Sequence, residues 1–160
     1  MPPQMVEDLV ERICASDVLD KVAAPLADAV QKVVPHGPVK DVFSGTWLGH
    51  PLHPMLTDVT IGAWTSAFML DIVGGTKARR AADSLVGIGV VSALPTAAAG
   101  LSDWSDLYGD ERRIGVVHAV GNVTAVAFYS LSYVARRRGK RLRGLAWGFL
   151  GATAATGSGY

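Results

Sequence analysis

The sequence predicts an all-α integral membrane protein, a four-helix bundle preceded by an amphipathic helical segment. Apolar residues make up 49% of its 160 residues and charged residues only 18%, less than the roughly 25% of a typical soluble domain. The mean hydropathy is positive, at +0.28. The apolar residues also form long runs that contain almost no charge. A water-soluble bundle with an unusually apolar core is the alternative, and it does not explain runs of this length.

The amphipathic segment and its linker occupy residues 1–44. Apolar side chains recur at helical spacing over residues 4–34, and charged side chains fill the opposite face. Ser16 is placed to cap a second helix, and Pro25 to kink it. Proline and glycine over residues 35–52 predict an irregular linker. We expect one or two helices that rest on the bundle or on the membrane surface.

The transmembrane domain follows over residues 45–160, with spans expected at about 54–73, 84–101, 114–135 and 142–160. The first span contains only Asp58 and Asp71 as charges, and the next two contain no Asp, Glu, Lys or Arg. A bilayer core about 30 Å thick requires about 20 helical residues, and the first three spans qualify. The fourth is rich in Gly and Ala and is the weakest. Small residues throughout the spans favour close approach of the helices.

The loop charges predict an orientation in the plasma membrane. The loops after the first and third spans hold nine of the 15 Lys and Arg residues. By the positive-inside rule these loops lie in the cytoplasm, and both termini lie on the outer side. The run that begins at Arg136 is expected to anchor the chain there and to contact anionic membrane lipid.

Several classes of function find no support. A net charge of +1 gives no reason to expect nucleic acid as a partner. Cys14 is the only cysteine, so the chain forms no disulfide framework or thiolate metal cluster of its own. The sequence contains no nucleophile–base pair and no phosphate-binding loop, which leaves a hydrolase or kinase without support.

Successive spans cross the membrane in opposite directions. This brings polar residues together at one membrane face, which is the outer one in this orientation. The start of the first span, the end of the second and the start of the third meet there, with three of the four histidines. Ionisable groups within a membrane are costly and indicate a functional site. The candidate cofactor-binding residues are His50, His53, Asp58, Asp103, Trp104, His118 and Asn122.

His53 and His118 are the preferred ligands of a cofactor or metal. His53 precedes Pro54, which suits the first position of a helix, so His53 is expected to be the N-cap residue. The positive end of a helix disfavours imidazolium and leaves a neutral ring with a free lone pair. His118 lies about one turn into the third span, and Asn122 follows on the same face.

These residues are compatible with several ligands. His118 and His53 are candidate axial ligands of haem b between two helices, with His50 in reserve and Asp58 or Asp103 orienting a ring. A divalent metal or a quinone head group is the alternative cofactor. The same residues are also compatible with structural roles. The histidines beside the prolines could form a rigid turn at the start of the span, and His118 could make a hydrogen bond between helices. Trp104 could anchor the chain at the membrane interface.

Three segments resemble a known family. Gly-His-Pro-Leu-His-Pro at 49–54, Ile-Gly-Ala-Trp at 61–64 and Asp71 resemble the opening helix of DUF2231, a domain-of-unknown-function family of bacterial membrane proteins. Gly-Leu-Ser-Asp-Trp at 100–104 and the segment 113–122 resemble its next two signatures. The resemblance covers about residues 45–160. The first forty residues resemble an actinobacterial subgroup whose members often continue into a Rieske iron–sulfur domain.

The resemblance implies more than this sequence contains. The resemblance implies a fourth helix that continues through a Gly-Gly-His-Leu segment beyond the position of Tyr160, with one further candidate histidine ligand, and a truncated chain would explain its absence here. An iron–sulfur domain there would lie on the face of the histidines, which suits electron transfer. Without an export signal such a domain is more naturally cytoplasmic, in conflict with the orientation that the loop charges predict.

The sequence thus predicts a membrane redox module that binds haem b or a quinone and exchanges electrons with a Rieske-type or other redox partner. The alternative is a non-catalytic anchor or assembly subunit of a larger membrane complex, with structural histidines. A transporter is the third hypothesis, and four spans without an internal repeat give it little support.

Overall fold

The all-α fold class is confirmed. The computed structural model describes residues 4–158, which contain helices and no strand. The elements are α1 (Gln4–Cys14), α2 (Asp17–Val33), α3 (Pro38–Ser44), the 3-10 helix η1 (Thr46–Leu48), α4 (Leu52–Val73), α5 (Arg79–Trp104), α6 (Gly109–Arg137) and α7 (Arg141–Ser158).

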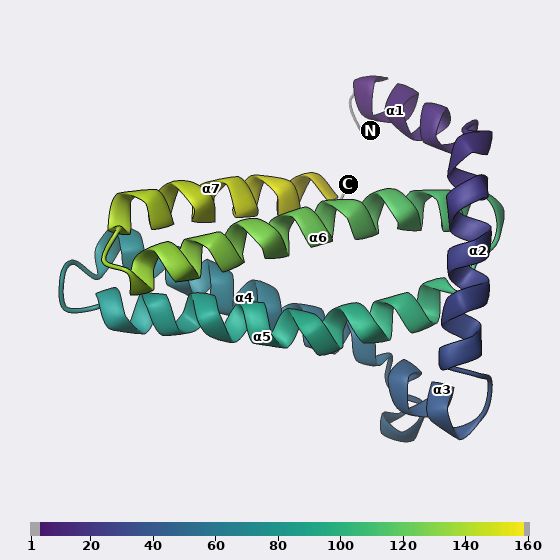
Figure 1. The fold of residues 1–160 in the computed structure, drawn as a ribbon, viewed down its shortest axis with the longest axis horizontal. Coiled ribbons are helices and arrows are strands. Elements are labelled where there is room, and N and C mark those ends of the chain that lie inside the picture. Colours follow the sequence, from purple (N-terminus) through teal and green to yellow (C-terminus); the bar gives the residue numbers. More distant parts are fainter. Residues whose placement is uncertain (1–3, 159–160) are drawn as a thin grey trace.

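The long helices α4 to α7 form an elongated antiparallel arrangement (Figure 1). α4 packs along α5 and α6 along α7, while the contact between α5 and α6 is less extensive. Among the described residues, α4, α5 and α6 are long and apolar enough to cross a membrane, and α7 is not in this group. Its first residues include Arg141 and Arg143, which lower its hydropathy. A bundle of four spans is therefore not confirmed, and residues 159–160 of the expected fourth span lie outside the described part.

Aromatic rings packed on glycines form the centre of the bundle. The ring of Trp64 on α4 stacks on that of Tyr129 on α6, with centroids 3.9 Å apart. A Cβ at Gly89 would overlap the indole of Trp64, and one at Gly151 would lie 2.8 Å from the ring of Tyr129. The expected close approach at small residues is confirmed at these positions, because no larger side chain fits there.

The outer surface of the three candidate spans is largely apolar. Because an exposed apolar surface of this extent is unusual for a monomer in water, its natural surroundings are lipid chains. Large apolar side chains that remain exposed include Ile61, Phe68, Ile88, Val91, Leu94, Val120 and Val123.

The N-terminal helices cover one end of the bundle. Figure 1 shows α2 lying across the ends of α5 and α6. Ala23 and Ala27 of α2 are fully buried and pack with Trp104 of α5. The expectation that the amphipathic segment rests on the bundle is thus confirmed.

Three local expectations require correction or refinement. α2 continues through Pro25 as one helix. Ser16 is the N-cap residue of α2, but its side chain makes no capping hydrogen bond. The linker expected to be irregular contains α3 and η1, which are separated by Gly45 with φ of 80°. Only a glycine fits there, because a Cβ would lie 2.7 Å from the backbone nitrogen of Leu52.

Ion pairs attach the N-terminal helices to the bundle. Arg113 of α6 binds Asp20 of α2 through both carboxylate oxygens, at 3.0 and 2.5 Å, and also donates to the carbonyl of Cys14. Lys40 of α3 is buried; it pairs with Asp106 at 2.7 Å and donates to the carbonyl of Ser102 at 2.8 Å. α1, α2 and α3 are therefore tied to the ends of α5 and α6 by charge as well as by packing.

We predict that Asp20→Asn loosens α1 and α2 and makes Cys14 react severalfold faster with a dipyridyl disulfide. The hydrogen bond from Arg113 holds the pKa of Asp20 below its ordinary value of 3.8. Its stabilisation is therefore present above pH 3.8 and is lost as the pH falls through the lowered pKa. The difference in rate between the variant and the wild type should therefore shrink as the pH falls through the lowered pKa, because protonation of Asp20 removes the same interaction.

The matched control is Asp28→Asn, which removes an exposed carboxylate from the same helix. If Asp28→Asn accelerates the reaction of Cys14 as much as Asp20→Asn does, the pair with Arg113 does not hold α2 in place.

Candidate functional site

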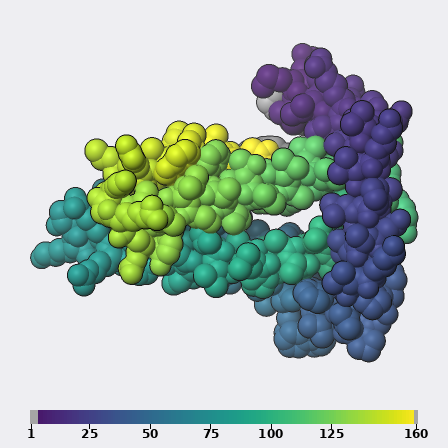
Figure 2. All heavy atoms as spheres, in the orientation of Figure 1, coloured from purple at the N-terminus to yellow at the C-terminus, as the bar shows by residue number. Residues whose placement is uncertain are grey.

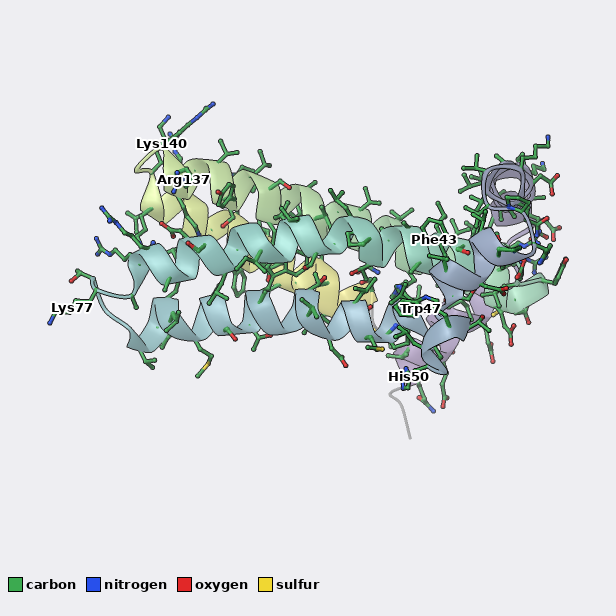
Figure 3. All side chains as sticks on the ribbon, turned by 90° about the horizontal axis from the view of Figure 1, so that it is seen from below. Phe43, Trp47, His50, Lys77, Arg137 and Lys140 are labelled. Carbon is green, nitrogen blue, oxygen red and sulfur yellow. The ribbon has the colours of Figure 1, made fainter. Side chains whose placement is uncertain are left out.

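The two ends of the bundle differ in chemistry. Figure 3 shows His50 with Phe43 and Trp47 at one end and Lys77, Arg137 and Lys140 at the other. We call the first the histidine end, which carries His50, His53 and His118. The second is the basic end, formed by the α4–α5 and α6–α7 loops.

His53 lies in the first turn of α4, between α4 and α5. The expectation that it is the N-cap residue is wrong: Pro51, with φ of −56° and ψ of 127°, is the N-cap. Pro54 still fits in the first turn, where backbone N–H groups have no partner within the helix. The Nδ1 atom of His53 lies 2.9 Å from the carbonyl oxygen of Thr96. Its ring packs on Gly100, where a Cβ would come within 2.6 Å.

His118 lies between α6 and the end of α7. Its Nδ1 is 2.8 Å from the carbonyl oxygen of Ser158, and its Nε2 is 2.9 Å from the amide nitrogen of Asn122. Asn122 also donates to the carbonyl oxygen of His118 at 2.9 Å. Asn122 therefore fixes the ring from the same face of α6, one turn further along.

Both rings are held in the same tautomer. A carbonyl oxygen only accepts hydrogen bonds, so Nδ1 of His53 and Nδ1 of His118 carry the proton in a neutral ring. The Nε2 atom of each ring then has the lone pair. Asn122 donates to that lone pair in His118, whereas that of His53 has no hydrogen-bond partner among residues 4–158.

The other candidate residues lie at the same end in different surroundings. Asp103 accepts a hydrogen bond from the hydroxyl of Ser44 at 3.0 Å. Trp104 is buried and donates to the carbonyl oxygen of Arg112 at 3.0 Å. His50 and Asp58 are exposed.

The structure does not bring all of these residues together. No hydrogen bond or ion pair within residues 4–158 joins His53 to His118, or a histidine to Asp58 or Asp103. The same residues contain no group of three or more His, Cys, Asp and Glu side chains that could hold a metal ion. His53 and His118 belong to different helix pairs, one to α4 and α5, the other to α6 and α7.

Hydroxyl groups extend from His53 along the contact of α4 with α5. The Oγ1 atom of Thr60 lies 2.9 Å from Oγ of Ser92 and 3.2 Å from Oγ1 of Thr96. Thr96 in turn accepts from His53 through its backbone. We call Thr60, Ser92 and Thr96 the polar seam. Sequence analysis missed it, although Ser92 and Thr96 lie one turn apart on one face of a helix, which is a signal for it.

A buried ion cluster at the basic end was also missed. It consists of one residue from each long helix: Asp71 of α4, Asp83 of α5, Arg136 of α6 and Arg141 of α7. Arg136 lies 2.5 Å from Asp71 and 3.2 Å from Asp83, with its side chain only 3% exposed. Arg141 pairs with both aspartates, at 2.9 Å in the case of Asp83. Two positive and two negative charges balance within the cluster.

The run at residues 136–143 was expected to anchor the chain and contact anionic lipid, but within it Arg136 and Arg141 bind the two aspartates. Sequence composition does not distinguish them from their exposed neighbours. A signal is nevertheless present in Gly144, where a Cβ would lie 2.5 Å from Cγ of Arg136. This glycine allows α6 and α7 to approach closely beside the buried guanidinium.

We predict that Arg136→Met destabilises the folded protein in detergent by up to about 3–5 kcal/mol, because Asp71 and the partly buried Asp83 each lose one of two arginine partners and two negative charges then face one positive charge. Thermal unfolding of the purified chain measures the effect. Arg137→Met, at the exposed neighbouring position, is the control and should change the unfolding temperature little. Equal effects of the two variants would contradict a specific role of the buried cluster.

Comparison with known proteins identifies the bundle. A family model described as "Predicted membrane protein (DUF2231)" matches residues 49–158, which include α4 to α7. No curated protein and no solved structure gives a significant match. The match does not extend to the subgroup linked to Rieske domains. Because it covers most of the chain, including the histidines, the polar seam and the ion cluster, this protein belongs to the DUF2231 family of predicted membrane proteins.

Proposed function

We propose that the protein is a membrane redox module that binds haem b near the histidine end, with His53 and His118 as ligands. The observation that carries the proposal is the shared tautomer of the two rings. Each Nδ1–H donates to a backbone carbonyl of a neighbouring helix, at 2.9 Å for His53 and 2.8 Å for His118. Metal-ligating histidines are usually held in this way, which leaves Nε2 for the metal.

The packing at the histidine end supports a bound group. Figure 2 shows an opening between α5 and α6 next to α2, at the same end as the histidines. The ring of His53 is fixed on Gly100, with no larger side chain beneath it. Ligation by His118 requires Asn122 to release Nε2, which costs one hydrogen bond of about 0.5–1.5 kcal/mol.

The tautomer also favours haem over an oxidised quinone. A neutral Nε2 accepts hydrogen bonds, whereas a quinone carbonyl needs a donor. A reduced quinone, whose hydroxyl donates, fits His53 better and is the second redox version of the proposal. A bound haem supplies one-electron chemistry, so the partner is an iron–sulfur protein of Rieske type or another redox component of a membrane complex.

We predict that the detergent-purified protein, expressed with haem supplied, has a Soret band that sharpens on reduction with dithionite. His53→Ala and His118→Ala should each abolish the band or shift it strongly, because each removes an axial ligand. Asn122→Leu should shift the band without abolishing haem binding. His36→Ala is the control and should leave the spectrum unchanged, since this exposed ring lies beside Asp106. A featureless spectrum of folded protein would overturn the haem proposal.

A second candidate function is that of a non-catalytic anchor or assembly subunit. The observation in its favour is that α1, α2 and η1 expose large apolar side chains outside the bundle: Met5, Leu9, Val18, Val22, Leu26 and Trp47. Both histidines would then be structural, as interhelical hydrogen bonds. In that case the protein has no visible band, and His53→Ala or His118→Ala lowers the unfolding temperature of the cofactor-free protein.

A further inference from the structure

An apolar groove lies between α4 and α7 on the surface of the bundle. Its volume is about 270 Å³, and it extends from Trp64 along α4 to Asp71 and Ile72, close to the basic end. Leu145 and Phe149 of α7 form the other side. From residue 64 to residue 72 a helix rises about 12 Å, so the groove follows α4 for roughly a third of a bilayer core.

The groove opens toward the surroundings of the bundle. Phe68 and Phe149 both line it and remain 52% and 66% exposed. The groove therefore receives an apolar chain from the side, as a lipid tail would enter. A small soluble anion would gain no stabilisation from contact with this apolar surface.

The polar end of the groove carries a surplus of positive charge. Arg136 and Asp71 reach the groove, but they are neutralised within the buried cluster. Seven further basic residues, in the two loops and the adjoining ends of the helices, are exposed and make no ion pair within residues 4–158. Figure 3 shows Lys77, Arg137 and Lys140 at this end. The seven are Lys77, Arg79, Arg80, Arg137, Arg138, Lys140 and Arg143.

We propose that the basic end holds an anionic phospholipid, with one acyl chain in the groove and its phosphate among the exposed basic residues. The acyl chain fills a surface that the bundle leaves open between α4 and α7. The headgroup offsets loop charge that the ion cluster does not neutralise. Basic residues beside transmembrane helices attract anionic lipid. The charge therefore selects an anionic headgroup, and the groove determines where the lipid binds.

The test is native mass spectrometry of the full chain in a mild detergent. Phosphatidylglycerol and phosphatidylcholine with identical acyl chains are added separately, and the lipid that stays bound is counted. We expect phosphatidylglycerol to be retained at least about tenfold more strongly. Equal retention of the two lipids would overturn the proposal, as would binding of inorganic phosphate alone to as large a fraction of the protein as phosphatidylglycerol.

Two variants separate the contributions of charge and groove. Replacing Arg137, Arg138, Lys140 and Arg143 by Gln should remove the preference for phosphatidylglycerol. Lys21→Gln with Lys32→Gln, on α2 at the other end, is the matched control and should preserve it. If the fourfold variant does not fold, Gln at Lys77, Arg79 and Arg80 tests the same charge from the other loop.

The groove is tested by Ile72→Trp, which places a larger side chain at its rim. We expect this change to reduce retention of both lipids severalfold. Ile88→Trp is the control, because Ile88 is similarly exposed on α5 and does not line the groove. Loss of binding in both variants, or in neither, would exclude the groove as the acyl-chain site.

Discussion

The buried cluster of Asp71, Asp83, Arg136 and Arg141 determines how the four long helices meet. Lipid gives apolar helices little reason to prefer one neighbour over another, whereas each residue of the cluster needs partners on other helices. Arg136 of α6 contacts the aspartates of both α4 and α5, and Arg141 of α7 contacts the same two. A different order of helices would leave charges buried and unpaired, which is far more costly than a loss of apolar contact.

The cluster joins the two helix pairs at the basic end, and the stack of Trp64 on Tyr129 joins them at the centre of the bundle. Away from the cluster, hydroxyl groups join α4 to α5, while glycines and the bond from His118 to Ser158 join α6 to α7. Near α2 the two pairs lie apart (Figure 2). There they are bridged by the N-terminal helices, through Arg113 and Lys40. At the histidine end the two pairs are thus joined through the N-terminal helices, and the ion cluster joins them directly only at the basic end.

Sequence analysis predicted the features that depend on local pattern. Apolar runs with few or no charges located three of the long helices, and helical spacing placed Asn122 beside His118. It failed for features that tertiary contacts determine, such as the burial of one arginine and not of its neighbour. Arg136 and Arg137 are chemically identical neighbours, and only the packing of α4, α5 and α7 around one of them makes it buried. The cap of α4 was misplaced because the rule that favours Pro at the first helical position fits Pro54, whereas the helix begins two residues earlier, at Leu52.

The two central histidines are not equivalent, and the difference bears on what the histidine end can bind. Both are held through Nδ1, but Nε2 of His118 already accepts the amide of Asn122. Nε2 of His53 has no such competitor within residues 4–158. A ligand that needs one lone pair therefore binds at His53 without breaking a bond, whereas a ligand that needs two must displace Asn122 and bring the two helix pairs together.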